Sequence, residues 1–257
     1  MVFINENTIA KYKGREEEFH QEFEKALERV RLGEEYPLII GEEEVKTSKT
    51  FEVRSPVDAS ILIGRFQIAD ENAIDKAFKA AKEAFKSWRL TSWKDRVETA
   101  KRAAELISRR KFELAATITL ENGKNRYEAI AEVDETIDYF NYYAYILQIN
   151  RGFEHEMDSR MYKNEHSYSV MKPYGSWAVI APFNFPLAIT TTMALGAVIT
   201  GNTVVIKPSS DTPLSAYNLV KIMLEAGFPP GVVNYITGSG KDIVDFMLTR
   251  SDGMAFT

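Results

Sequence analysis

The sequence contains no cysteine, and this absence excludes more chemistry than any residue that is present. Without a thiol, the chain offers no disulfide, no cysteine nucleophile and no cysteine-ligated zinc site. Histidine is scarce as well, since the three histidines His20, His155 and His166 are scattered over distant polar segments. We therefore expect neither a histidine-based catalytic triad nor a metal site in these 257 residues.

The chain also lacks a strongly basic segment. Its formal net charge is -5 at pH 7, and no dense cluster of lysine and arginine overrides that balance, which argues against binding of nucleic acid. The first residues, MVFINENTIAKYKG, do not have the basic-then-apolar order of a signal peptide. A cytoplasmic protein is therefore predicted.

One long run has no charged side chain, from Pro173 to Ile206. Its length raises the question of a membrane span. The run is interrupted by two prolines, three glycines, Asn184 and a threonine triplet, which suits a buried strand–helix–strand unit better. We expect no membrane contact.

The first 155 residues predict a helical region with short strands. An amphipathic helix ends before Gly33, and two short strands are expected at 37–45 and 49–56. Four more helices are expected at 70–88, from Ser92, at 111–121 and from about Arg126. Asp70 and Ser92 stand at N-cap positions, and Ser92 has Asp95 at the spacing of a capping box.

Two segments before residue 173 differ from this pattern. The helix from Arg126 carries a set of aromatic residues for which core packing is favoured over a ligand site: Tyr139, Phe140, Tyr142, Tyr143 and Tyr145. Residues 156–172 predict a polar hairpin arm that turns at Lys163-Asn164. Because such a ribbon is marginal in isolation, we expect it to pair with another part of an assembly.

Residues 173–257 alternate between strands and helices. Strands are predicted at 177–182, 203–208, 232–237 and 253–257, with helices between them. The second of these helices has Thr212 as its predicted cap and Pro213 at its first position. The alternation predicts an α/β fold, a Rossmann-like doubly wound parallel sheet that binds ligands at the carboxyl ends of its strands.

Two polar residues follow strand ends in this sheet. Asn184 comes just after the first strand, in APFNFP, where an unpaired buried amide would cost about 1–3 kcal/mol. It either caps the following helix or donates an N–H to developing negative charge, as in an oxyanion hole. Lys207 ends the second strand and is either a solvated loop lysine or a donor to a ribose hydroxyl or phosphate.

A glycine pair follows the third strand, in TGSGKDIV. Gly238 and Gly240 allow a cofactor to approach the backbone at a helix N-terminus. The dinucleotide fingerprint is incomplete, because Ile243 occupies the position of its third glycine. An ordinary strand-to-helix turn explains the pair equally well.

Taken together, these segments resemble the aldehyde dehydrogenase superfamily. The resemblance is carried by APFNFPLAI, GNTVVIKPSSDTPLSA, EAGFPPGVVNYITGSG and MAFT, in this order. In the first half, YPLIIGEEEV, AFKSWRLTSWKDRVETAKRAAELI and ETIDYFNYYA look most like the 1-pyrroline-5-carboxylate dehydrogenase branch. The resemblance covers essentially all 257 residues and implies one NAD-binding domain, with a helical part (1–155), the arm (156–172) and a Rossmann-like part (173–257).

The resemblance implies a role for seven residues. Asn184 would stabilise the oxyanion formed when a thiolate attacks an aldehyde, and the backbone of Ile180, Ala181 and Phe183 would line the nicotinamide side of the cofactor. Lys207 would bind the adenosine ribose, and Gly240 would lie beside the adenine. Ser210 stands where many NAD-preferring members carry a glutamate, so NAD is expected without exclusion of NADP.

The resemblance also implies that these residues are only part of an enzyme. The family's cysteine nucleophile, its general-base glutamate and its pyrophosphate-binding serine are not in this sequence, so we expect the chain alone to be inactive. The complete enzyme would oxidise glutamate 5-semialdehyde, in equilibrium with its cyclic imine, to glutamate. Its expected partners are further copies of itself or a polypeptide that carries the C-terminal half. The alternative is a stand-alone protein that binds a nucleotide or a partner without catalysis.

Overall fold

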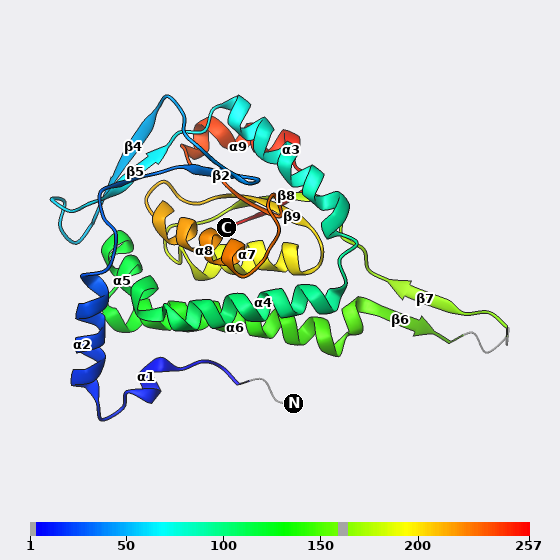
Figure 1. The fold of residues 1–257 in the computed structure, drawn as a ribbon, viewed down its shortest axis with the longest axis horizontal. Coiled ribbons are helices and arrows are strands. Elements are labelled where there is room, and N and C mark those ends of the chain that lie inside the picture. The colour runs from blue at the N-terminus through cyan, green and yellow to red at the C-terminus, as the bar shows by residue number, and fades with distance from the viewer. Residues whose placement is uncertain (1–3, 159–163) are drawn as a thin grey trace.

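The structure is a computed structural model that describes residues 4–158 and 164–257 (Figure 1). Its centre is a six-stranded sheet in the order β11-β8-β9-β10-β2-β3. Four neighbouring strands of this sheet run parallel: β11 (Gly253–Phe256), β8 (Ser176–Ile180), β9 (Thr203–Lys207) and β10 (Val233–Tyr235). The predicted parallel sheet is therefore confirmed, and its four strands are the four that the sequence predicts.

Helices cover both faces of the sheet, as the doubly wound prediction requires. On one face lie α3 (Glu71–Trp88) and α9 (Gly240–Arg250), whose apolar side chains form one cluster with the sheet. On the other lie α7 (Ala188–Ile199) and α8 (Pro213–Glu225), with α4 (Trp93–Arg109) and α6 (Arg126–Ile149) packed outside them (Figure 1). The remaining α-helices of the described residues are α1 (Thr8–Lys11), α2 (Glu16–Leu27) and α5 (Lys111–Asn122), and a short 3-10 helix, η1 (Arg151–Phe153), follows α6.

The short strands of the first half differ from the prediction. The segment 37–45 is a hairpin of two strands, β2 (Leu38–Ile40) and β3 (Glu43–Val45), and it extends the main sheet through an antiparallel pair with β10. A second sheet has the order β1-β5-β4, with β1 (Glu34–Tyr36), β5 (Leu62–Gln67) and β4 (Thr50–Arg54). The sequence prediction missed β1 and β5; β1 has only three residues and is stabilised by its parallel pairing with β5, which lies further along the chain.

The helix caps show where local sequence is sufficient. The Asp70 side chain accepts a hydrogen bond from Ala73 N at 2.8 Å, and the Ser92 hydroxyl accepts one from Asp95 N at 3.2 Å, so both predicted caps are confirmed. Thr212 occupies the N-cap position of α8, but its hydroxyl makes no capping bond and is buried without a partner. The predicted position of the cap is therefore confirmed, but the amides at this helix end bond to Glu121 and not to the Thr212 side chain.

The aromatic residues of α6 are only partly in the core. Phe140 is fully buried, whereas Tyr142 is 42% exposed. Tyr139 and Tyr143 are half-buried, and Tyr143 shares a hydrogen bond with Thr192 of α7. Core packing is thus correct for Phe140 and wrong for Tyr142, because a long helix that packs on one side turns its opposite face outward.

The arm that follows α6 is an antiparallel hairpin of β6 (Glu154–Met157) and β7 (Ser167–Val170), and it projects away from the body (Figure 1). Lys163 of the predicted turn lies outside the described residues. All eight residues of the two strands are exposed. No helix of the described ranges combines the length and the apolar character needed to cross a membrane.

The strand β11 forms one edge of the main sheet and carries exposed apolar side chains. Met254 is 39% exposed and Phe256 is 66% exposed. An apolar sheet edge is a template for pairing with another chain, so we expect the protein to self-associate at high concentration. Sedimentation velocity over a concentration series measures this, with Met254→Lys expected to weaken association and Leu90→Lys, at an exposed residue of another region, as control. A monomer at every concentration would contradict the prediction.

Candidate functional site

The candidate site lies where β8 and β9 end at the same level of the sheet. Ile180 and Lys207 are register partners, and Ala181 N donates a hydrogen bond to Lys207 O at 3.0 Å. Beyond these strand ends is a cavity of about 540 Å³. It is lined by Ala181, Pro182, Phe183, Asn184, Lys207, Ser209, Ser210, Asp211, Gly240 and Thr257. Six of the seven predicted site residues line this one cavity, and Ile180 lies directly behind it at the end of β8.

Lys207 is buried, which rules out the solvated loop lysine. Its exposed fraction is 4%, and its Nζ donates to Pro208 O at 2.8 Å. Burial lowers the pKa of Lys207, an effect that the charge of Asp211 partly opposes. A buried ammonium group with one backbone acceptor retains N–H donors for a ligand.

The glycine turn lies against this lysine. Gly240 is the first residue of α9, and a side-chain carbon built on it would come within 3.8 Å of Lys207 Cε. Gly238 has a φ of +146°, which favours glycine at this position. Ser210 links the two loops, because its hydroxyl donates to Gly238 O at 3.1 Å. The glycine pair thus brings the backbone of the third strand's loop up to the cavity.

Asn184 is exposed, contrary to the expectation that its place in the charge-free run would bury it. The chain turns outward through Phe183, which is 58% exposed, and back to α7. Asn184 does not cap α7. The N-cap residue of that helix is Leu187, and its side chain makes no capping hydrogen bond. The capping alternative is therefore excluded, and the amide lies at the edge of the cavity that Lys207 also lines.

Three residues near the junction of α5 and α6 hold this segment, and the sequence prediction missed all three. Glu132 of α6 accepts hydrogen bonds from Leu187 N at 2.8 Å and Ala188 N at 3.2 Å, which caps α7. Lys124 pairs with Glu132 at 2.6 Å, and Asn122 donates to Phe183 O at 2.7 Å. The only sequence signal of Asn122 and Lys124 is the polar string ENGKN, which is equally typical of a solvated helix end, and Glu132 lies outside that string.

A second buried carboxylate caps α8 in the same manner. Glu121, the neighbour of Asn122, accepts from Leu214 N, Ser215 N and the Ser215 hydroxyl. Burial raises the pKa of Glu121 to about 7 in spite of these donors, and the charge of Glu132 adds to the rise. The two helices that begin beside the cavity are thus capped by carboxylates from the α5–α6 layer.

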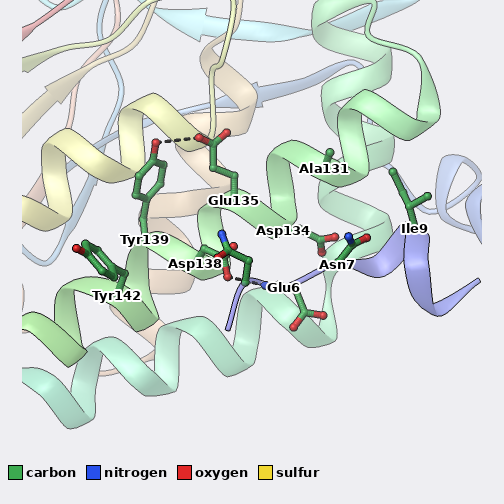
Figure 2. A pocket seen from close by; sticks show the side chains of 10 residues that line it. Glu6, Asn7, Ile9, Ala131, Asp134, Glu135, Asp138, Tyr139 and Tyr142 are labelled. Carbon is green, nitrogen blue, oxygen red and sulfur yellow. Dashed lines mark hydrogen bonds between the residues drawn. The ribbon is translucent and has the colours of Figure 1, made fainter. Parts of the chain in front are cut away.

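A larger cavity of about 600 Å³ lies elsewhere, between α6 and the N-terminal segment (Figure 2). Its lining is acidic, with Glu6, Asp134, Glu135 and Asp138 beside Tyr139 and Tyr142. These carboxylates already have partners: Asp134 accepts from Thr8 N and the Thr8 hydroxyl, and Asp138 accepts from Glu6 N at 2.7 Å. Tyr139 donates to Glu135, as the dashed line in Figure 2 shows. The cavity shares no lining residue with the first, and Asp134 and Asp138 fasten the N-terminal segment to α6.

The fold and the site together define a class of protein. A doubly wound parallel sheet with a lysine and a glycine turn at its carboxyl ends is typical of nucleotide-binding α/β proteins. A model of the aldehyde dehydrogenase family matches residues 44–257. The chain belongs to the aldehyde dehydrogenase family, and the family predicted from the sequence is confirmed.

The relatives show which members of the family this chain is similar to. The chain is 39% identical over 230 residues to a 1-pyrroline-5-carboxylate dehydrogenase of Staphylococcus saprophyticus, an alignment that covers 89% of this chain and 44% of the relative. It is 40% identical over 242 residues to that of Geobacillus thermodenitrificans, with 92% and 46% covered. The structure of 1-pyrroline-5-carboxylate dehydrogenase from Thermus with bound NAD has a TM-score of 0.88 and 38% identity, with 96% and 48% covered. The chain thus spans about half the length of these proteins and corresponds to their N-terminal half.

Proposed function

We propose that this chain is the cofactor-binding part of an NAD-dependent aldehyde dehydrogenase. The observation that supports this most strongly is the single cavity that places buried Lys207 beside Gly240 and Asn184 at the carboxyl ends of β8 and β9. The Thermus relative with bound NAD supports NAD as the cofactor, and Ser210 in place of an acidic residue leaves room for NADP. The domain would comprise a helical part (1–155), the arm (156–172) and a Rossmann-like part (173–257).

The residues of the cavity suit a dinucleotide. Lys207 has N–H donors left for the hydroxyls of the adenosine ribose, and the Ser210 hydroxyl keeps its lone pairs as acceptors while it donates to Gly238. Gly240 leaves space beside Lys207 for the adenine. The backbone of Ile180, Ala181 and Phe183 forms the wall on the side proposed for the nicotinamide.

The chemistry of the complete enzyme would be divided between this chain and residues outside it. Bound NAD supplies the hydride acceptor. Asn184 would donate its side-chain N–H to the oxygen of an aldehyde as that oxygen gains negative charge, and this lowers the barrier only if the amide is held in place. The thiolate that attacks the carbonyl carbon cannot come from this chain, because it has no cysteine.

We propose glutamate 5-semialdehyde as the substrate of the complete enzyme. The support is the name that the relatives of this chain share, 1-pyrroline-5-carboxylate dehydrogenase. The aldehyde, water and NAD would give glutamate and reduced NAD, with two electrons and one proton passing to NAD as hydride and two further protons released. The partner of the chain would be a further copy or a polypeptide that carries the C-terminal half, and the location would be the cytoplasm.

We expect the isolated chain to show no NAD-dependent aldehyde oxidation. The measurement is NADH absorbance with glutamate 5-semialdehyde, over a time long enough to detect one turnover per chain. The variant Asn184→Ala serves as control, since a contaminating enzyme would leave its activity equal to that of the wild type. Turnover by the wild type that Asn184→Ala abolishes would contradict the expected inactivity.

We also expect weak NAD binding that depends on Lys207. Removing a charged donor costs about 1.5 kcal/mol or more, so Lys207→Met should raise the Kd for NAD about tenfold. The exposed Lys49→Met is the matched control and should leave the Kd unchanged. Isothermal titration calorimetry measures both. If Lys207→Met and the wild type bind NAD with equal affinity, the proposed site is overturned. If the wild type binds NAD as tightly as a complete dehydrogenase does, a stand-alone binding protein is favoured.

A further inference from the structure

The segment 181–188 carries Asn184 between the end of β8 and the first turn of α7, and most of it has no regular structure. Its hydrogen bonds to the sheet are few, the first being Ala181 N to Lys207 O. Phe183, Asn184 and Phe185 are all exposed. Their own packing therefore contributes little to fixing the position of the Asn184 amide.

Contacts from a different layer fix the segment on both sides of Asn184. Before it, the Asn122 side chain donates to Phe183 O at 2.7 Å. After it, the Lys124 ammonium lies 3.5 Å from the ring centroid of Phe185, within the range of a cation–π interaction. Asn122 and Lys124 are separated only by Gly123, whose φ of +85° ends α5 and turns the chain toward α6.

The same lysine connects these contacts to the start of α7. Its ammonium group pairs with Glu132 at 2.6 Å, and the other oxygen of Glu132 holds the amides of Leu187 and Ala188. The exposed fraction of the side chain is 14% for Lys124 and 0% for Glu132. Hydrogen bonds and ion pairs are stronger at such low exposure, so the connection is stiff.

From this geometry we infer that Asn122, Lys124 and Glu132 form a clamp that positions Asn184 for its role at the cavity. The inference rests on the proposed function of Asn184. None of the three touches the reacting atoms, and all three act through the backbone or ring of the segment 181–188. An oxyanion donor is effective only within about 2.7–3.1 Å of its acceptor, so a small displacement of this segment matters for the reaction.

The test measures amide hydrogen exchange by NMR in the full chain. The amides of Leu187 and Ala188 report on the segment, and the amide of Val205 in the buried strand β9 reports on the whole fold. In Asn122→Ala and in Lys124→Met, we expect exchange at Leu187 and Ala188 to rise three- to tenfold relative to Val205. Lys124→Arg should restore most of the protection, and Asn141→Ala, at an exposed position of α6, should change nothing.

The outcomes separate the clamp from the proposed function. The clamp is overturned if exchange at Leu187 and Ala188 relative to Val205 is unchanged in both Asn122→Ala and Lys124→Met. It is also overturned if exchange at all three amides rises by the same factor. A titration with NAD on the same samples follows the amides of Lys207 and Gly240. If NAD does not shift these amides in the wild type, the proposed function fails, and the role of the clamp at the cavity fails with it. The exchange measurement then still shows whether Asn122, Lys124 and Glu132 hold the segment 181–188. If NAD shifts them, Asn122→Ala is expected to raise the Kd at least threefold.

Discussion

Replacing Glu132 by alanine is expected to lower the free energy of unfolding by about 3 kcal/mol, because it removes one partner of a buried ion pair. Lys124 would remain at low exposure without its carboxylate, and the amides of Leu187 and Ala188 would lose their acceptor at the start of α7. Each unsatisfied buried group costs about 1–3 kcal/mol. This is among the largest single-residue effects that we expect in the chain.

Urea denaturation followed by circular dichroism measures the loss. The matched control is Glu135→Ala on the same helix, where the carboxylate is exposed and accepts one bond from Tyr139. Its expected loss is below about 1 kcal/mol. A double variant that replaces Lys124 by methionine as well should recover part of the stability of Glu132→Ala, since no unpaired charge remains. A loss for Glu132→Ala no larger than that of the control would show that the pair does not stabilise the fold.

The second large effect is a fall in the contribution of Glu121 to stability as the pH rises from about 4.5 to about 7. Burial raises the pKa of Glu121 from 4.5 to about 7, so the folded chain retains a proton that the unfolded chain releases. Below 4.5 both states hold the proton, and above 7 both have lost it. Between these values each rise in pH favours unfolding, and the full difference amounts to about 3 kcal/mol.

Glu121→Gln isolates this contribution. The variant has no proton to release, so the free energy of unfolding of the wild type minus that of the variant is expected to decrease by about 3 kcal/mol between pH 4.5 and pH 8. Glu113→Gln at an exposed position of α5 is the control, and its difference from the wild type should stay flat over the same range. Urea titrations at several pH values provide the measurement. A wild type that gains stability over Glu121→Gln as the pH rises would contradict the prediction.

The sequence predicted best where the deciding interactions are local. Asp70 and Ser92 cap their helices because each needs only an amide three residues away. Thr212 is the N-cap residue of α8 as predicted, but its side chain makes no capping bond, since Glu121 reaches the start of α8 from 93 residues away. The three-residue strand β1 was missed for a similar reason, since it is stabilised by pairing with β5 and not by its own sequence.

The site residues show the same difference between what local sequence predicts and what distant contacts decide. The ends of the predicted parallel strands made Lys207 and Gly240 candidates, and the family resemblance assigned them their roles at the cofactor. The sequence did not determine which of these side chains is exposed to solvent. Lys207 is buried, although a lysine at a loop is usually exposed, and Asn184 is exposed, although it lies in a charge-free run. Exposure depends on which other elements pack above the strand ends.

By itself, the sequence determined the class of fold, the family and the residues at the carboxyl ends of the sheet, and its lack of cysteine determined that no thiolate comes from this chain. Only the tertiary structure showed that α7 and α8 are capped by Glu132 and Glu121, and that Asn122 and Lys124 hold the segment around Asn184. The physical reason is distance along the chain. A buried carboxylate is stable where it meets donors, and those donors lie 55 and 94 residues further on, out of reach of any local pattern.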